Sequence, residues 1–218
     1  MAAYDLDLRE RTPYGVIVNE NHVQLCGSPE WATYLQDEVL PLLAEHVSVG
    51  DEMLEIGPGP GAATGWLSKR VKRLVAVEVD AHAAKVLAER YKDSNVEVRV
   101  GDATELAFPD ASFDAVGSFT MLHHVPTPEM QTRILGEALR VLRPGGVLLG
   151  SDSLPSNALH EFHEGDTYNP IEPSSLLVRL QTLGYGQVTI VVDHLLRFIA
   201  RKPVGEDVDC DRRDAGST

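Results

Sequence analysis

Glycine residues follow a short apolar run in the segment LEIGPGPGAATGW, residues 54–66. Gly57, Gly59 and Gly61 lie between that run and a helical segment, so we expect a tight strand-to-helix turn. Because glycine has no side chain, such a turn lets a ligand lie against main-chain amides. Glu78 ends the next apolar run, VAVEV, where its carboxylate is well placed to accept two hydrogen bonds from ribose hydroxyls. Together these positions predict a nucleoside site.

Two cofactor classes fit this turn, because Gly57, Gly59 and Ala62 also satisfy the looser dinucleotide pattern GxGxx(G/A). Glu55 would repel a pyrophosphate, whereas its carboxylate can help to hold an ammonium or sulfonium group. The prolines between the glycines remove two amide donors that a phosphate cradle would use. Asp102 ends a third apolar run, where a carboxylate could accept the adenine amino group. These features favour S-adenosylmethionine over a dinucleotide.

Histidine and acidic side chains supply candidate catalytic and metal-binding residues. His123 and His124 follow the run FDAVGSF, at the strand end where open α/β sheets bind ligands. With an ordinary pKa of about 6.5, either histidine suits a general base, although one of them could merely pack or orient a loop. Asp152, His160 and His163 could gather a divalent cation such as Mg²⁺. The alternative is a charge-rich, solvated loop.

Short apolar runs alternate with helical segments from about residue 50 to 150, which indicates repeated βαβ units and a parallel sheet. The five runs span residues 53–57, 74–79, 96–101, 113–119 and 146–152. A helix at about 174–182 and two β-rich runs, 188–192 and 195–200, then predict a hairpin at one edge. The expected fold class is therefore α/β, with a Rossmann-like, mostly parallel sheet, helices on both faces and an antiparallel C-terminal hairpin.

The rest of the chain predicts one domain with appendages. We expect an N-terminal arm or lid over residues 1–27, a domain over 28–203 and a disordered polar tail over 204–218. Segment 153–173 is too long for a simple connection and is expected to be a substrate loop. The arm could close over the cofactor, swap onto a partner subunit or fray. Its polar cluster consists of Tyr14, Asn19, Asn21, His22 and Gln24.

The composition excludes several classes of partner. The 218 residues include 19 basic and 33 acidic side chains, for a net charge of −14, which disfavours nucleic acid and anionic lipid surfaces. No apolar stretch approaches the roughly 18 residues of a membrane span, and the charged start is unlike a secretory signal. A cytoplasmic location is therefore expected. Cys26 and Cys210 have no metal or disulfide spacing, so both are interpreted as bystanders.

Taken in order, the motifs resemble those of class I S-adenosylmethionine-dependent methyltransferases that act on small molecules, the methyltransferase 11-like group. The motifs are MLEIGPGPG, VAVEVD, GDATELAF, FDAVGSFTMLHHV and LRPGGVLLGSD. The last run, ending in RFIARKP, resembles that family's reversed final strand. The resemblance covers roughly residues 50–202 and implies a seven-stranded sheet. It also implies that Glu78 binds ribose, that Asp102 and the Ala103 amide bind adenine, and that the glycine turn lies along the methionine part.

The fourth motif bears on the methyl acceptor. Family members that methylate nitrogen in nucleic acids or proteins carry an Asn or Asp, two prolines and an aromatic residue there, whereas this chain has Ser118, Phe119, Thr120 and Met121. Ser118 is a further candidate for the cofactor site. The expected activity is O-methylation of a small polar metabolite, with a sugar hydroxyl favoured and a homodimer as one expected assembly. The alternatives are C-methylation of a quinone-like ring, a non-catalytic cofactor-binding partner subunit and a nicotinamide-dependent oxidoreductase.

Overall fold

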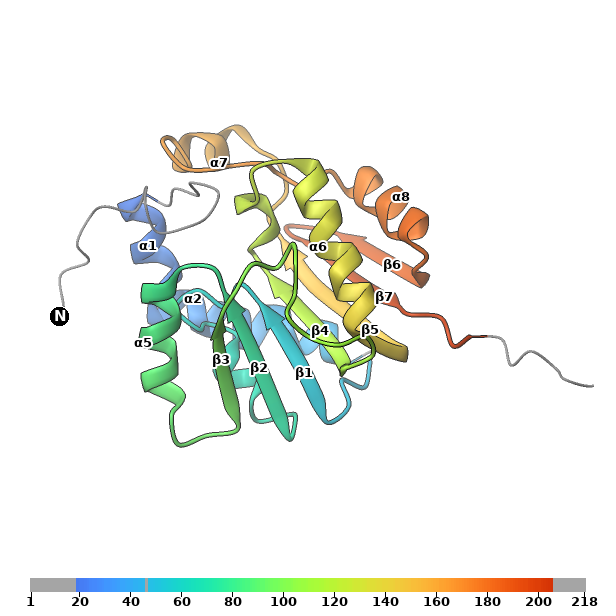
Figure 1. Ribbon diagram of the computed structural model, residues 1–218. Coiled ribbons are helices and arrows are strands. Elements are labelled where there is room, and N and C mark those ends of the chain that lie inside the picture. The colour runs from blue at the N-terminus through green and yellow to red at the C-terminus, as the bar shows by residue number, and fades with distance from the viewer. Residues whose placement is uncertain (1–18, 46, 206–218) are drawn as a thin grey trace, which may run out of the picture.

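A seven-stranded mixed sheet forms the centre of the computed structural model, which describes residues 19–45 and 47–205 (Figure 1). The strands are β1 (Glu52–Ile56), β2 (Arg73–Glu78), β3 (Val96–Val100), β4 (Phe113–Phe119), β5 (Leu142–Asp152), β6 (Gly186–Val192) and β7 (Leu196–Arg201). Their order is β3-β2-β1-β4-β5-β7-β6. The first five pair in parallel, and β7 pairs antiparallel with both β5 and β6. This confirms the predicted α/β fold.

The helices flank this sheet, and two of them begin at residues that favour a helix N-terminus. They are α1 (Glu20–Cys26), α2 (Pro29–Tyr34), the π-helical turn η2 (Leu35–Val39), α3 (Leu40–Ala44), α4 (Thr64–Leu67), α5 (Ala81–Tyr91), the 3₁₀ turn η3 (Leu122–His124), α6 (Pro128–Val141), α7 (Asn157–Phe162) and α8 (Pro173–Leu183). Ser28 and Thr127 cap α2 and α6 by accepting backbone N–H bonds, and a proline follows each cap. None of the helices in the described ranges is long and apolar enough to cross a membrane.

Alternate residues of the central strands enter two separate cores. Leu54 and Val116 pack in the core that includes buried residues of α6 and α8. Met53 and Ala115, their neighbours along β1 and β4, pack in the core that includes η2, α3 and α4. Because successive side chains of a strand point to opposite faces, both faces of the sheet are covered by helices.

The strand order reverses next to β1, which has β2 on one side and β4 on the other. In open α/β sheets, ligands bind beyond the carboxyl ends of the strands at such a reversal. The residues after β1, β2 and β4 therefore surround the expected ligand position.

Two short helices lie where the sequence predicted irregular structure. Helix α1 falls inside the expected N-terminal arm, and α7 falls inside the expected substrate loop. Figure 1 shows both near the same end of the molecule. Residues 1–18 of the arm and 206–218 of the tail lie outside the described residues, so those predictions stay untested.

Candidate cofactor and acceptor site

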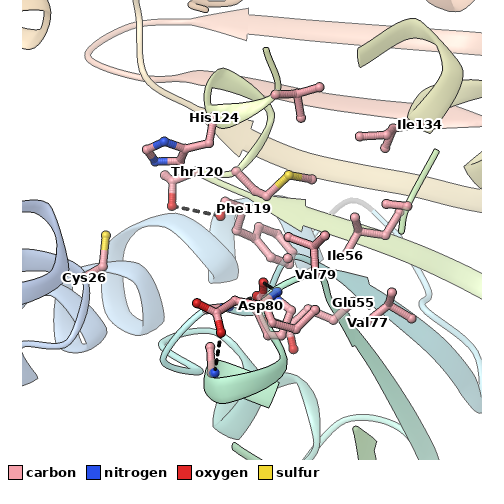
Figure 2. Close-up of a pocket in the computed structure, with 18 of the residues that line it drawn as sticks. Cys26, Glu55, Ile56, Val77, Val79, Asp80, Phe119, Thr120, His124 and Ile134 are labelled. Atoms are coloured by element: carbon pink, nitrogen blue, oxygen red, sulfur yellow. Dashed lines mark hydrogen bonds between the residues drawn. The ribbon is translucent and has the colours of Figure 1, made fainter. Parts of the chain in front are cut away.

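A cavity of about 250 Å³ opens at the carboxyl ends of β1, β2 and β4 (Figure 2). Its walls come from the turn after β1, the end of β2, the segment after β3, the end of β4, and helices α1 and α6. The lining includes Glu55, Gly57, Pro58, Gly59, Glu78, Asp80, Asp102, Ala103, Thr120, Met121, His124, His22, Cys26, Val125, Met130 and Ile134. A few polar groups thus converge in a largely apolar cavity, which is typical of small-molecule sites.

The turn after β1 needs its glycines for two different reasons. Gly57 has φ +65°, and a Cβ there would lie 2.2 Å from Cγ of Met121. Gly61 has φ +87°, and its Cβ would lie 2.5 Å from Cδ1 of Leu87 on α5. Gly57 lines the cavity, whereas Gly61 lets the turn pack closely on α5 and is not among the lining residues of the described chain. Of the three predicted glycines, Gly57 and Gly59 therefore line the cavity and Gly61 serves packing.

Side chains from neighbouring elements hold this turn from outside. The amide Nε2 of Gln36, on the π-helical turn η2, donates to the carbonyl of Ala62 at 2.9 Å. Nη1 of Arg90, on α5, donates to the carbonyl of Pro60 at 2.6 Å. The backbone facing the cavity is therefore fixed before any ligand binds, which reduces the entropy cost of binding.

Glu78, at the end of β2, is buried with its carboxylate directed by backbone donors. Oε2 accepts from the N–H of Gly59 at 2.9 Å, and Oε1 accepts from the N–H of Asp80 at 3.1 Å. Burial raises the pKa of Glu78, although these backbone donors oppose the shift. The predicted ribose-binding carboxylate therefore lies in the cavity wall in a fixed orientation.

The other two predicted cofactor carboxylates also line the cavity. Glu55 is buried, accepts from Oγ1 of Thr64 at 2.7 Å, and has its pKa raised to about 7 chiefly by burial. Asp102 accepts from the N–H and the hydroxyl of Thr104, each at 2.8 Å. Ala103 lies beside it in the lining. Glu55, Glu78 and Asp102 thus meet in one cavity, as a cofactor with a cation, a ribose and an adenine would require.

Ser118 has a different position. It lies on β4 with its side chain buried, and its hydroxyl has no hydrogen-bond partner among the described residues. It pairs with Ile56 and Gly150 inside the sheet and is not one of the described residues that line the cavity. The following residues line it instead, and Thr120 has the left-handed φ of 51°. Such strain in a residue other than glycine is common at functional sites.

The two predicted catalytic histidines differ in whether they reach the cavity. His124 lines the cavity, and its Nδ1 lies 3.2 Å from the carbonyl of Thr167. Burial lowers the pKa of His124 well below its usual value, so the ring is neutral near pH 7. His123 is buried outside the cavity lining, with Nδ1 2.5 Å from Oδ1 of Asp152. His124 is therefore the histidine that faces a bound ligand.

Polar contacts fix the backbone that carries this pair. Nε2 of Gln131, on α6, donates to the carbonyls of Leu122 and Asn169 at 2.9 and 2.8 Å. The N–H of Asn169 donates in turn to the carbonyl of His123 at 2.7 Å. The histidine turn is thus fastened to the buried face of α6.

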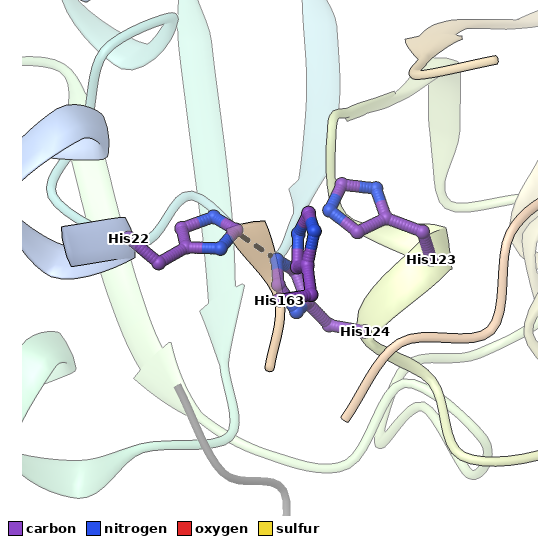
Figure 3. Close-up of side chains that lie close together, drawn as sticks. All are labelled: His22, His123, His124 and His163. Atoms are coloured by element: carbon purple, nitrogen blue, oxygen red, sulfur yellow. Dashed lines mark hydrogen bonds between the residues drawn. The ribbon is translucent and has the colours of Figure 1, made fainter. Parts of the chain in front are cut away.

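Two further histidines join the pair (Figure 3). His22 comes from α1, and His163 directly follows α7. One ring nitrogen from each of His22, His123, His124 and His163 lies within 4.8 Å of one from each of the others. We call these four residues the histidine group. The sequence analysis gave no ligand role to His22, because nothing in the spacing of positions 22, 123 and 163 brings them together.

The predicted metal ligands are brought together only in part. His163 belongs to the histidine group, and Asp152 contacts that group through His123. His160 is exposed and lies outside it. The structure therefore places nitrogen donors at the centre and a carboxylate behind them, rather than the oxygen-rich set that Mg²⁺ prefers.

The described part of the N-terminal arm lies against the substrate loop. The N–H of Asn19 donates to Asp166, and its side-chain amide donates to the carbonyl of Phe162 at 2.8 Å. The polar side chains of Asn21 and Gln24 are exposed, and Tyr14 lies outside the described residues. Cys26 lines the cavity, where burial raises the pKa of its thiol to about 12 and makes it unreactive. Cys210 lies outside the described residues.

The fold is that of class I S-adenosylmethionine-dependent methyltransferases. A solved structure of such a methyltransferase from Aquifex aeolicus superposes with a TM-score of 0.66 at 18% identity, covering 85% of this chain and 100% of that one. Residues 54–150 match the family model described as a methyltransferase domain. Residues 54–150 therefore form a methyltransferase domain of the kind that the motifs predicted.

Curated relatives are similar at the sequence level. The erythromycin 3''-O-methyltransferase of Saccharopolyspora erythraea is 34% identical over 165 residues, which is 70% of this chain and 52% of that protein. The 27-O-demethylrifamycin SV methyltransferase of Amycolatopsis mediterranei is 33% identical over 130 residues, 57% of this chain and 46% of that protein. The chain thus spans about half the length of the curated relatives it matches.

Proposed function

We propose that this protein transfers the methyl group of S-adenosylmethionine to an oxygen atom of a small polar metabolite, with a sugar hydroxyl as the favoured acceptor. The observation that carries the proposal is that His124 lines the same cavity as Glu78 and the glycine turn. A proton acceptor and the proposed cofactor-binding groups therefore face one cavity, as a direct transfer requires.

The cofactor assignment follows the chemistry of each part of the cavity. Glu78 accepts the ribose hydroxyls, and Asp102 with the Ala103 amide holds the adenine. The glycine turn lies along the methionine portion, where the ionised Glu55 carboxylate attracts the ammonium group. Met121 and His124 line the same cavity and would lie near the methyl group of a bound cofactor.

The protein has two tasks in the transfer step. The sulfonium already activates the methyl carbon, so the chain must align the acceptor in line with the breaking bond and remove its proton. Since the carbonyl of Thr167 can only accept, Nδ1 of His124 carries the hydrogen and Nε2 keeps its lone pair. We assign His124 as the base. His123, held by Asp152 outside the cavity lining, has the weaker claim to this role.

The nature of the acceptor is inferred from two lines of support. The fourth motif lacks the Asn/Asp and prolines found in family members that methylate amines, and the erythromycin relative is named for a transfer to oxygen. The largely apolar wall that includes Val125, Met130 and Ile134 favours a second candidate, C-methylation of a quinone-like ring. Either acceptor needs the base, because an acidic carbon must also lose a proton.

Two measurements test the proposal. Isothermal titration should show one molecule of S-adenosylhomocysteine bound per chain, and no binding to the folded protein would refute the cofactor assignment. Methyl-labelled S-adenosylmethionine is then incubated with panels of glycosides, phenols and quinones. Mass spectrometry and NMR of the products should locate the label on oxygen. A label on carbon would support the second candidate, and tight cofactor binding without turnover of any acceptor would favour a non-catalytic partner subunit.

A further inference from the structure

The four rings of the histidine group direct the same kind of atom toward one another. Nδ1 of His124 faces the carbonyl of Thr167 at 3.2 Å, and Nδ1 of His163 faces the carbonyl of Leu159 at 2.6 Å. A carbonyl oxygen can only accept, so both Nδ1 atoms carry hydrogen and both Nε2 atoms carry a bare lone pair. Hydrogen bonding thus fixes the tautomer of these two rings.

The other two rings lie beside carboxylates. Nδ1 of His123 is hydrogen-bonded to Oδ1 of Asp152 at 2.5 Å, whereas Nδ1 of His22 lies 3.3 Å from Oδ2 of Asp166 without a hydrogen bond. His123 therefore also offers Nε2 as a lone-pair donor. In His123, His124 and His163, an Nδ1 atom bonded to a carboxylate or carbonyl matches the arrangement by which proteins orient histidine ligands of metals.

The Nε2 atoms have little else to bind. Nε2 of His123 and Nε2 of His163 are buried without a hydrogen-bond partner among the described residues, and those two residues are only 2% and 4% exposed. Nε2 of His22 lies 3.2 Å from Nε2 of His124, so the lone pair of His124 has another ring nitrogen as its neighbour. Buried lone pairs without a partner cost free energy, which a cation at their centre would recover.

The surrounding charge also calls for a cation. Asp152 and Asp166 have fully buried side chains, and in the described chain their ion pairs are with His123 and His22 rather than with lysine or arginine. Buried carboxylates without a lysine or arginine partner are costly unless a nearby cation compensates them. A divalent ion bound by the histidine group would do so.

We propose that His22, His123, His124 and His163 bind one divalent transition-metal ion through their Nε2 atoms. Four imidazoles suit Zn²⁺, Co²⁺, Ni²⁺ or Fe²⁺ and do not suit Mg²⁺, which requires oxygen ligands. A tetrahedral site with bonds of about 2.0–2.1 Å has nitrogens about 3.3 Å apart. The His22–His124 separation of 3.2 Å already fits that value, and the other separations, all within 4.8 Å, would shorten by up to about 1.5 Å on binding.

The ion would join segments that are far apart in the sequence. His22 belongs to α1, His123 and His124 follow β4, and His163 follows α7. Coordination would fasten α1 and the substrate loop over the acceptor end of the cavity, which His22 and His124 line. Four imidazoles fill a tetrahedral site, so the ion would be structural. Nε2 of His124 cannot bind the ion and accept a proton at once, so the base proposed above acts only in the metal-free chain.

Metal binding is tested on the whole chain after dialysis against a chelator. Co²⁺ is titrated into the protein while visible absorption is recorded, and Zn²⁺ is then added to displace it. We expect tetrahedral Co²⁺ bands that saturate at one ion per chain and disappear with Zn²⁺, together with a melting temperature that rises with Zn²⁺. A wild-type protein that gives no bands and no rise in melting temperature would overturn the inference.

Variants show whether the ion occupies the histidine group. His163→Ala should weaken Zn²⁺ binding at least about 100-fold, and Asp166→Asn, which keeps all four ligands, should weaken it about 10- to 100-fold. His160→Ala is the matched control from the same loop and should leave affinity unchanged. Equal losses in His160→Ala and His163→Ala, or competition by Mg²⁺, would overturn the assignment. Asp166→Asn provides the test if His163→Ala does not fold.

The metal test and the methyl-transfer test are independent. A protein that binds Zn²⁺ through these histidines but does not bind S-adenosylhomocysteine refutes the proposed function and leaves the metal site standing. A protein that binds S-adenosylhomocysteine but no metal does the reverse.

Discussion

The carboxylate of Glu78 accepts a hydrogen bond from the backbone N–H of Gly59 across 2.9 Å. One residue ends β2 and the other lies in the turn after β1, so the bond ties together two neighbouring strand ends. The cavity wall on this side is therefore organised around a single buried carboxylate.

Replacing Glu78 by alanine should weaken the binding of S-adenosylhomocysteine by about 1–3 kcal/mol, because ribose hydrogen bonds to a charged acceptor are lost. Isothermal titration measures the change. Glu89→Ala, on the exposed face of α5, is the matched control and should bind like the wild type. Unchanged affinity in Glu78→Ala would remove this residue from the cofactor site.

Gly57→Ala should destabilise the protein by more than Gly59→Ala. Both positions have positive φ and pay about 1–2 kcal/mol for a Cβ in the left-handed region. Only at Gly57 does the new Cβ also collide with Met121, whereas nothing lies within 4 Å of it at Gly59. Urea unfolding measures the difference. Adding Met121→Ala should recover part of the loss in Gly57→Ala, and no recovery would contradict the steric explanation.

The stability of the protein should depend on pH through Glu55. The pKa of its carboxyl is raised from 4.5 to about 7, chiefly by burial. Between these values the folded chain holds a proton that the unfolded chain has lost, so stability falls as pH rises through that window. The loss amounts to as much as about 3 kcal/mol. Urea unfolding at pH 5 and pH 8 should show this slope, and Glu55→Gln should show less of it. Parallel slopes in the two proteins would contradict the assignment.

Cofactor binding should show the opposite trend with pH. Only the ionised Glu55 attracts the ammonium group, and with a pKa of about 7 its ionised fraction rises from about 0.1 at pH 6 to about 0.9 at pH 8. Affinity for S-adenosylhomocysteine should therefore rise by up to about tenfold over this range, and Glu55→Gln should abolish the rise. Titration calorimetry at pH 6 and pH 8 measures the affinity of both proteins. An equal rise in affinity in the wild type and in Glu55→Gln would contradict the role of Glu55.

His124→Asn should lower kcat by about 10²–10⁴-fold at saturating cofactor, as expected for the loss of a general base. Affinity for S-adenosylhomocysteine should stay within about twofold, since His124 faces the acceptor end of the cavity. His194→Asn, in the exposed turn between β6 and β7, is the control. Full activity of His124→Asn with the acceptor identified from the panel would rule out histidine catalysis.

The sheet was predictable because each strand is a local signal. The run FDAVGSF became β4 with the predicted bounds, and the hairpin of β6 and β7 lies at the predicted edge. Short, continuous apolar runs that alternate with helical segments are typical of strands in a parallel sheet whose two faces are covered by helices. The apolar runs and their alternation with helices are therefore enough to predict the sheet. The helices α1 and α7 were not predicted, because each is short and is held by contacts with distant residues such as Asn19.

Only those residues of the candidate site that lie at strand ends could be predicted from the sequence. Glu55, Glu78 and Asp102 each lie at or just after a strand end, and parallel strands bring those ends together. No comparable sequence pattern predicts the histidine group. His22 and His124 are 102 positions apart and meet because α1 packs against the site. Metal ligands that come from separate segments have no characteristic spacing in the sequence, so the sequence could not predict this group.

Gln131 and Asn169 anchor the histidine turn, so the shape of the cavity can change while the two histidines keep their position. Met130 and Ile134 lie on the same helix as Gln131 and line the cavity, so substitutions there can reshape the acceptor end without moving the reactive pair. Exchanging these two side chains for those of a relative is thus a rational route to a new specificity.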